Sequence, residues 1–442
     1  MCKVSVLVPV YNVKKYLRQC LDSLAAQTLD GIEFVCIDDG STDGSEKILD
    51  EYAEQDMRFR VIHKENSGYG ASMNVGLRAA QGEYIGIVES DDFAEAEMFV
   101  ALYEAAQESH AEVVKSNYFQ FTERGDVFQE LLRGCPYGSL CSAKDVPKLM
   151  QTDTFVWTSL YRKDFLAGNG IWFHETPGAS FQDVAFSMKV AACCRWMFLL
   201  PEAYLHYRVD NMGSSIHRMR QKYHCYHDEF AEFWRFLHTK GAAEQKAGAP
   251  ASYNMWRIYQ TNCWPCIERL ERVPYLRGVI REFQQLDAEG FLQEIDWPAE
   301  TWKTLRNLID HPTNVLFRYA EEAQESRLLK EGCLHCLREA PRFYLYGAGQ
   351  VAKGLLEIFE KKGLQASGLL VSRAEGNPSA VRGVPVYELQ DSPADCEHDI
   401  VVIAVTPKRP EIQQEIFFAL EEAGDRNVIV LTEELRQALA EA

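Results

Sequence analysis

Three carboxylates crowd the end of one short apolar run. The run at 84–88 is followed by Glu89, Asp91 and Asp92, with Ser90 interspersed. Nearly continuous apolar character is typical of a buried parallel strand, and open α/β sheets bind ligands at the carboxyl ends of such strands. Carboxylates this close repel one another unless a cation shares the site, and a divalent ion carrying a diphosphate would do so. A solvated acidic turn is the alternative.

A second acidic pair closes an earlier apolar run. Asp38 and Asp39 follow the run at 32–37 and precede a turn of helix-capping residues at 41–45. Carboxylates here can accept hydrogen bonds from a base N–H group and from ribose hydroxyls. Because the sequence contains no G-x-x-x-x-G-K-[ST] loop, we expect a nucleotide-diphosphate donor rather than ATP.

The elements that must position these residues alternate between strands and helices. Strands are predicted at 4–12, 32–40, 59–63 and 84–88. Between them, apolar residues recur at helical spacing or capping residues mark helix starts. Such alternation implies right-handed crossovers and a parallel sheet. Three of the strands then end in polar or acidic residues at the same edge, which makes one site.

Four motifs resemble those of family 2 glycosyltransferases, in that family's order and spacing. They are Pro9-Val10-Tyr11-Asn12, Asp38-Asp39-Gly40-Ser41-Thr42-Asp43, Asn74-Val75-Gly76 and Glu89-Ser90-Asp91-Asp92. The resemblance covers residues 1–215, about half the chain. It implies a GT-A fold, an α/β domain that binds a nucleotide-diphospho-sugar.

The resemblance also implies roles for individual residues. The residues expected to bind the donor nucleotide are Pro9, Tyr11, Asn12, Asp38, Asp39, Asn74, Glu89 and Ser90. Asp91, together with Asp92 or Glu89, is expected to hold Mg²⁺ or Mn²⁺ under the diphosphate. Two departures stand out, because the family commonly has aspartate at the position of Glu89 and arginine at that of Met73. Local capping is the alternative role for Asn74.

An aspartate at the start of a later apolar helix is the candidate catalytic base. Asp183 follows Gln182, and the family places its base in a Glu-Asp or Gln-Asp step like this one. The resemblance implies that Asp183 takes the proton of an acceptor hydroxyl as that oxygen attacks the sugar, with inversion. A favourable charge at a helix N-terminus is the alternative role.

His206 and Arg208 are candidates for contacting the diphosphate. They lie in the stretch Tyr204-Leu205-His206-Tyr207-Arg208-Val209, and similar sequences carry a tyrosine-arginine step like the one at 207–208. They could supply the positive charge that Met73 does not. A strand pair with a surface salt bridge is the alternative.

The segment 216–338 is helical in pattern and rich in aromatic residues. Aromatic residues at helical spacing usually form core. The alternative is that some of these aromatic residues bind the acceptor or form a contact between subunits, so a homo-oligomer is also considered.

Two C-x-x-C pairs lie in the second half of the chain: Cys263 with Cys266, and Cys333 with Cys336. They favour buried free thiols over a zinc site, because the tight turns of zinc knuckles are missing.

The segment 339–442 predicts a small Rossmann-like domain. Gly347 and Gly349, followed by Ala352, form a loose dinucleotide fingerprint after an apolar run, and are candidates for a second nucleotide site. An acidic residue is expected after the second strand of an NAD(P) site, but Ser372 and Arg373 stand there. NAD(P) is therefore disfavoured as a cofactor, and a packing or assembly role is the alternative.

Composition limits the classes of partner. The 442 residues are 47% hydrophobic and 25% charged, with a net charge of −19. The negative charge argues against nucleic acid as a partner and against simple adsorption to an anionic membrane. No apolar run reaches the length of a membrane span. We expect a cytoplasmic protein with reduced cysteines, and peripheral contact with the inner face of the membrane stays open.

The combined expectation is an α/β protein in three parts: a GT-A domain at 1–215, a helical extension at 216–338 and a Rossmann-like domain at 339–442. Its expected function is metal-dependent, inverting transfer of a sugar from a UDP-sugar to a glycan or lipid-linked acceptor in surface polysaccharide biosynthesis. One alternative is an NAD(P)-dependent oxidoreductase or epimerase run from the last domain. The other is a nucleotide-sugar-binding scaffold without catalysis.

Overall fold

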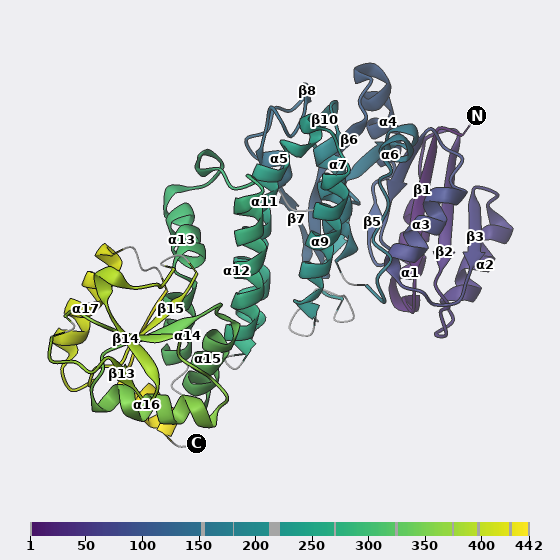
Figure 1. Ribbon diagram of the computed structural model, residues 1–442. Coiled ribbons are helices and arrows are strands. Elements are labelled where there is room, and N and C mark those ends of the chain that lie inside the picture. Colours follow the sequence, from purple (N-terminus) through teal and green to yellow (C-terminus); the bar gives the residue numbers. More distant parts are fainter. Residues whose placement is uncertain are drawn as a thin grey trace. The chain divides into compact units, whose positions relative to one another are not determined.

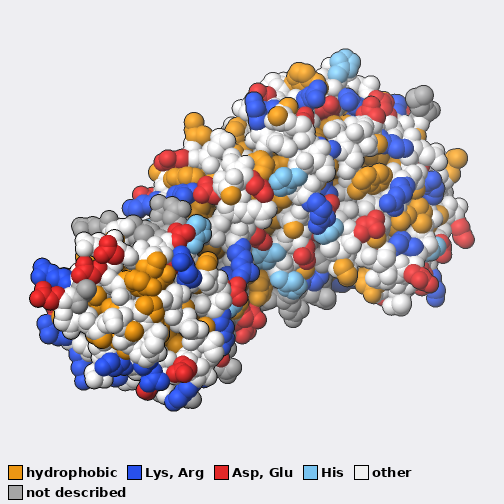
Figure 2. Space-filling model, viewed as in Figure 1, with side chains coloured by type: hydrophobic (Ala, Val, Ile, Leu, Met, Phe, Trp, Pro, Cys, Tyr) orange, Lys and Arg blue, Asp and Glu red, His pale blue; other side chains and the backbone are white. Residues whose placement is uncertain are grey.

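The computed structural model divides into two compact units, Met1–Cys266 and Ile267–Ala442 (Figure 1). It describes residues 2–151, 155–179, 181–211, 222–268, 271–322, 326–373, 375–395, 398–423 and 427–440. The boundary between the units, after Cys266, divides the segment 216–338 that was expected to be one helical extension. The expected boundary at 215 lies outside the described residues. Acidic and basic side chains are interspersed over the face of each unit shown in Figure 2.

The first half of the first unit is the parallel sheet that the sequence predicted. Its strands are β1 (Val4–Val10), β2 (Ile32–Asp38), β3 (Phe59–His63) and β4 (Tyr84–Ile87). They lie in the order β3-β2-β1-β4 and pair in parallel. Strands β1 and β4 are buried throughout, as expected for strands covered on both faces.

Three helices cross between these strands. They are α1 (Lys14–Ala25), α2 (Ser45–Gln55) and α3 (Tyr69–Ala79). Helix α1 buries Leu17, Cys20, Leu21 and Leu24, the spacing of one helical face. Helix α3 lies close to the sheet at Gly76, where a Cβ atom would be 2.8 Å from Cδ1 of Ile37. These crossovers return every strand in the same direction, so the strand ends share one edge.

The sheet continues with mixed pairing in the order β4-β9-β6-β10-β5. These strands are β5 (Phe93–Ala94), β6 (Val113–Thr122), β9 (Ser159–Arg162) and β10 (Met197–Arg208), with β7 (Gly125–Gln129) and β8 (Leu140–Cys141) beside them. Strand β9 runs antiparallel to both β4 and β6. Further helices among the described residues of the unit are α4 (Met98–Ser109), α5 (Lys148–Gln151), α6 (Lys163–Asn169), α7 (Gln182–Cys193), α9 (Cys225–His238), α10 (Ala242–Gln245) and α11 (Gly248–Ile258). A π-helix at Tyr259–Cys263 continues α11.

The second unit begins with helices and ends in a second sheet. The helices are α12 (Arg272–Ala288), α13 (Ala299–Asp310), α14 (Pro312–Glu322) and α15 (Ser326–Glu339). The strands are β11 (Phe343–Tyr346), β12 (Gly368–Val371), β13 (Ala380–Val381), β14 (Val384–Glu388), β15 (Ile400–Ile403) and β16 (Val428–Val430). Helices α16 (Gln350–Lys361), α17 (Pro410–Glu422) and α18 (Glu433–Ala440) accompany them.

The order β14-β12-β11-β15-β16 with parallel pairing is that of a doubly wound sheet, as the sequence predicted. Gly347 lies in the turn after β11 at φ +121°, and Gly349 is the N-cap residue of α16. Ala352 is buried in the first turn of α16. Within the described residues, no helix is both long and apolar enough to cross a membrane.

Candidate active site

A cavity of about 580 Å³ lies in the first unit, at the edge where β1 and β4 end. Six of the predicted site residues line it: Tyr11, Asn12, Glu89, Ser90, Asp91 and Asp183. Tyr11 and Asn12 follow β1, and Asp91 lies beyond β4. Asp183 enters from α7, which is far from these strands in sequence. The structure therefore brings the strand-end carboxylates and the candidate base to one space.

Asp183 lies in the first turn of α7. Burial raises the pKa of its carboxyl from 3.8 to about 6, while backbone N–H groups at the helix start hold that pKa down. The carboxylate is therefore mainly ionised at neutral pH and still basic enough to accept a proton. A catalytic base works best when its pKa lies near the working pH.

Glu89 faces the cavity and accepts a hydrogen bond from Tyr69 Oη at 2.7 Å. Burial raises the pKa of Glu89 to about 8; the tyrosine hydrogen bond lowers it, and the charges of Asp91 and Asp183 raise it further. Tyr69 begins α3 and also lines the cavity. Sequence reasoning missed Tyr69, which belongs to none of the four motifs that carried the family resemblance.

The two aspartates after Ser90 point in different directions. Asp91 lines the cavity, and its Oδ2 accepts a hydrogen bond from Nδ2 of Asn211 at 2.7 Å. Asp92 is 1% exposed and does not line the cavity; its Oδ1 accepts the backbone N–H of Arg208 at 2.8 Å. Its Oδ2 is buried without a hydrogen-bond partner, and burial raises the pKa of this carboxyl.

Few protein ligands for a metal ion are gathered at this edge. Within the described residues there is no group of three or more His, Cys, Asp or Glu side chains that could hold a metal. Asp91 with Glu89 nearby suits an ion that takes most of its ligands from a diphosphate and water, which is how Mg²⁺ is often bound. The residues present therefore fit an ion that arrives with the donor, rather than a resident one.

Asp38 and Asp39 turn away from the cavity. Oδ1 of Asp38 accepts the N–H of Ser41 at 2.9 Å, and its Oδ2 lies 2.8 Å from Nδ1 of His63. Asp39 accepts a hydrogen bond from Nζ of Lys64 and, at 2.9 Å, the N–H of Gly68. Both aspartates shape the turns around the cavity. Pro9 lies within β1, opposite Ile37 of β2.

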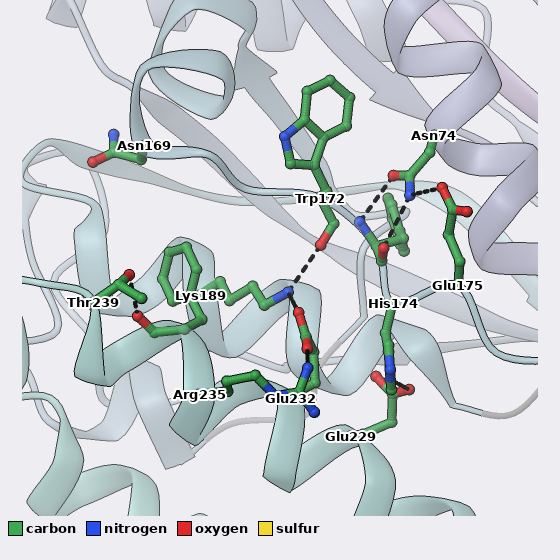
Figure 3. A network of polar contacts seen from close by, with 12 residues as sticks. Asn74, Asn169, Trp172, His174, Glu175, Lys189, Glu229, Glu232, Arg235 and Thr239 are labelled. Carbon is green, nitrogen blue, oxygen red and sulfur yellow. Dashed lines mark hydrogen bonds and ion pairs between the residues drawn. The ribbon is translucent and has the colours of Figure 1, made fainter.

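Asn74 has a positioning role in the structure. Its Nδ2 donates to the carbonyl of Phe173 at 3.0 Å and to Glu175 at 2.9 Å, and its Oδ1 accepts the N–H of Phe173 at 3.0 Å. Figure 3 shows Asn74 of α3 bonded to the irregular segment that precedes α7. Asn74 does not line the cavity.

His206 and Arg208 are committed to protein partners. His206 lies 2.9 Å from both Glu95 and Asp126, and its ring stacks on Phe93. Nε of Arg208 donates to the carbonyl of Asp91 at 2.9 Å. Neither residue lines the cavity, so Arg208 holds the acidic turn in place instead of facing it. The cationic side chains lining the cavity, within the described residues, are those of Lys14, Lys15 and Arg257.

Helix α7 is fixed by a buried polar network (Figure 3). Nζ of Lys189 donates to the carbonyl of Trp172 at 3.1 Å and to Glu232 of α9 at 2.7 Å. Nδ1 of His174 lies 3.1 Å from Glu229, which is also on α9 and is fully buried. Burial raises the pKa of Glu229 to about 9 and the charge of Asp183 adds to the shift. This network sets the position of the helix that carries Asp183.

Aromatic side chains form much of the remaining wall. Trp157 stacks on Tyr207 with ring centroids 5.0 Å apart, and Phe181 stacks on Tyr226 at 4.5 Å. All four line the cavity. Tyr226 belongs to α9, and Arg257, Ile258 and Asn262 add the end of α11 and the π-helix. Sequence reasoning did not single out Trp157, Phe181 or Tyr207, and for Tyr226, in the segment 216–338, it left both core and acceptor platform open.

Comparison with known proteins gives the family. The family model described as glycosyl transferase family 2 matches residues 5–179. Glycosyltransferase YibD of Escherichia coli (strain K12) is 30% identical over 243 residues, 53% of this chain and 70% of YibD. The chain belongs to glycosyl transferase family 2. Of the residues that line the cavity, Tyr11, Asn12 and those at 89–91 lie within the stretch matched by the family model. Asp183, Tyr226 and Arg257 lie after it.

Another relative matches a shorter stretch. Glycosyltransferase GlyG of Streptococcus pneumoniae serotype 4 is 44% identical over 132 residues, 30% of this chain and 44% of GlyG. The chain thus spans less than half the length of that relative. Among solved structures, residues 1–349 of S. aureus TarS in complex with UDP-GlcNAc match with a TM-score of 0.56 and 20% identity, over 74% of this chain and 91% of that one. This likeness confirms the expected GT-A fold.

Proposed function

We propose that this cavity transfers a sugar from a nucleotide-diphospho-sugar to an acceptor hydroxyl, with inversion at the anomeric carbon. The observation that carries the proposal is the meeting of Asp91 and Asp183 at one cavity of about 580 Å³. One carboxylate suits the leaving diphosphate and its cation, and the other has the pKa of a base. Family membership supports the same chemistry.

Asp183 would act on the acceptor. Its carboxylate takes the proton of the acceptor hydroxyl as that oxygen forms a bond to the anomeric carbon. The bond between the anomeric carbon and the diphosphate oxygen breaks, and its electron pair leaves with the nucleotide diphosphate. No protein nucleophile is required, because attack and departure occur on opposite faces of the sugar carbon.

We also propose that Asp91, with Glu89 beside it, holds Mg²⁺ or Mn²⁺ when the donor is bound. Such an ion would neutralise the charge that develops on the leaving diphosphate. Lys14 and Lys15 line the same cavity and could offer further positive charge to the phosphates. We propose a UDP-sugar as donor and a glycan or lipid-linked acceptor of surface polysaccharide biosynthesis as the partner.

Calorimetric binding of UDP, GDP, CDP and NAD(P)H to the full chain tests the proposal, with Mn²⁺ present and then with EDTA. We expect one nucleoside diphosphate to bind in the presence of Mn²⁺ and to be released by EDTA. Binding of NAD(P)H with no diphosphate binding would move the activity to the second unit and overturn the proposal.

A further inference from the structure

Phe181 has an unfavourable backbone conformation two residues before the proposed base. Its φ of 62° and ψ of 33° lie in the left-handed region, where the Cβ atom of a bulky side chain is crowded. As the N-cap residue of α7 it makes no side-chain hydrogen bond to the helix. Glycine would suit this backbone better, and Ser, Thr, Asp or Asn would be the usual cap. Neither the backbone conformation nor helix capping therefore explains a phenylalanine at this position.

The ring of Phe181 has a defined position in the cavity wall. It lies flat on the ring of Tyr226, with centroids 4.5 Å apart and an interplanar angle of 9°. Tyr226 is almost fully buried, and its Oη accepts a hydrogen bond from Nδ2 of Asn262 at 3.1 Å. Phe181 is partly exposed and lines the cavity. The strained residue is thus the outer member of a stacked pair that is fixed from behind.

We propose that Phe181 is the surface on which a sugar ring of the acceptor stacks, so that the acceptor is a glycan whose reacting unit is a sugar ring. This inference rests on the proposed function, because the acceptor hydroxyl must reach Asp183 two residues along the chain. The electron-rich face of an aromatic ring attracts the C–H groups on one face of a sugar. Residues held in such backbone conformations cluster at functional sites. A simple lipid alcohol has no flat face of C–H groups that could stack on this ring.

The decisive variant is Phe181→Gly, which removes the ring and relieves the backbone. Transfer from the donor is measured to a panel of methyl pyranosides, with octanol and glycerol 3-phosphate as comparison acceptors. We expect the KM for an accepted pyranoside to rise about tenfold, the loss of some 1.4 kcal/mol of binding free energy. The dissociation constant of UDP with Mn²⁺ should stay unchanged, and the unfolding midpoint should stay within about 4 °C. Phe181→Tyr keeps the ring and should keep the KM.

His110 offers a matched control. It also has a left-handed backbone, with φ 56° and ψ 32°, but it caps the C-terminus of α4 and does not line the cavity. His110→Gly relieves the same kind of crowding and should leave the KM for the pyranoside unchanged. Should Phe181→Gly fail to fold, Phe181→Asn replaces it, since asparagine tolerates this backbone region.

Two results would overturn the inference. The first is an unchanged KM in Phe181→Gly or Phe181→Asn, which would show that the ring does not hold the acceptor. The second is transfer to octanol or glycerol 3-phosphate and to no pyranoside, which would show another acceptor class. Both are distinct from failure of the proposed function, which would appear as no binding of any nucleoside diphosphate by the unaltered chain.

Discussion

Gly70 lies directly against the backbone of His174. A Cβ atom at position 70 would be 1.9 Å from the carbonyl oxygen of His174, a distance that no side chain could tolerate. The neighbouring N–H of Tyr69 donates to the carbonyl of Gly178 at 3.1 Å. The start of α3 and the segment that leads to Asp183 are therefore packed backbone to backbone.

Gly70→Ala should separate these two segments. We expect the variant to lose about 1 to 3 kcal/mol of folding stability, because the added methyl group meets backbone and not a movable side chain. Transfer should fall as well, since the segment at 172–178 precedes the helix of Asp183. The midpoint of urea unfolding and the transfer rate are the measurements.

Gly168 supplies the control for Gly70→Ala. It lies in α6 of the same unit, and a Cβ atom there would meet nothing within 4 Å. Gly168→Ala should be neutral or stabilise by about 0.5 kcal/mol through the entropy of the unfolded chain. Equal midpoints for both variants would contradict the close packing of α3 on the 172–178 segment.

Asp183→Asn should abolish transfer and keep nucleotide binding, because the amide cannot accept the acceptor's proton. In the unaltered chain the transfer rate should fall as the pH drops below about 6, since protonated Asp183 is inactive. Steady-state rates from pH 5 to 8, with UDP binding at each pH, provide the measurement. A variant that retained most of its transfer activity would show that another group is the base.

Asp91→Ala should remove the metal dependence of nucleotide binding. Without this carboxylate, UDP should bind equally weakly with Mn²⁺ and with EDTA, because the ion loses its ligand at the cavity. Asp164→Asn is a fitting control: this residue pairs with Arg162 at the surface and does not line the cavity. Metal-enhanced UDP binding that survives in Asp91→Ala would rule out the proposed ion position.

Glu229→Gln should change how stability depends on pH. Burial raises the pKa of Glu229 from 4.5 to about 9, so the folded chain holds this proton more tightly than the unfolded chain. The stability that the proton contributes is complete below pH 4.5 and is lost as the pH rises toward 9. Glutamine needs no proton, so the variant should gain stability relative to the unaltered chain between pH 5 and 9.

Thermal unfolding midpoints at several pH values measure this gain. Glu54→Gln, on the exposed face of α2, should show no such trend. If the difference between Glu229→Gln and the unaltered chain were constant over this pH range, Glu229 would not be holding a proton in the folded protein.

The place of the acidic strand ends was predictable because alternating strands and helices leave little choice of topology. Asp91 reaches the cavity after β4, whereas Asp183, which the family resemblance and not the topology pointed to, reaches it from α7. The position of a residue at the carboxyl end of a strand gives the location of its Cα atom, however, and does not give the direction of its side chain. Asp38 meets His63 across the parallel pair of β2 and β3, and Asp39 meets Lys64 just beyond it; spacing in the sequence does not reveal this register.

The residues that sequence reasoning did not place share another cause. Tyr226 and Asn262 come from a segment whose pattern is that of an ordinary amphipathic helix. Whether an aromatic side chain on such a helix meets core or cavity depends on how the helix packs. Here the contacts of α9 with α7, through Lys189 and Glu232, decide it.

The cavity is assembled from two consecutive stretches of chain, since Tyr11 and Asp91 precede residue 179 while Asp183, Tyr226 and Arg257 follow it. Under the proposed function, Asp91, which is assigned to the donor diphosphate, precedes residue 179, whereas Asp183, which is assigned to the acceptor, follows it. An evolving lineage could replace the later stretch and redirect the sugar to a new recipient while the earlier one went on handling the same activated donor. A chimaera between two such proteins, joined near residue 179, would inherit its donor from one parent and its recipient from the other.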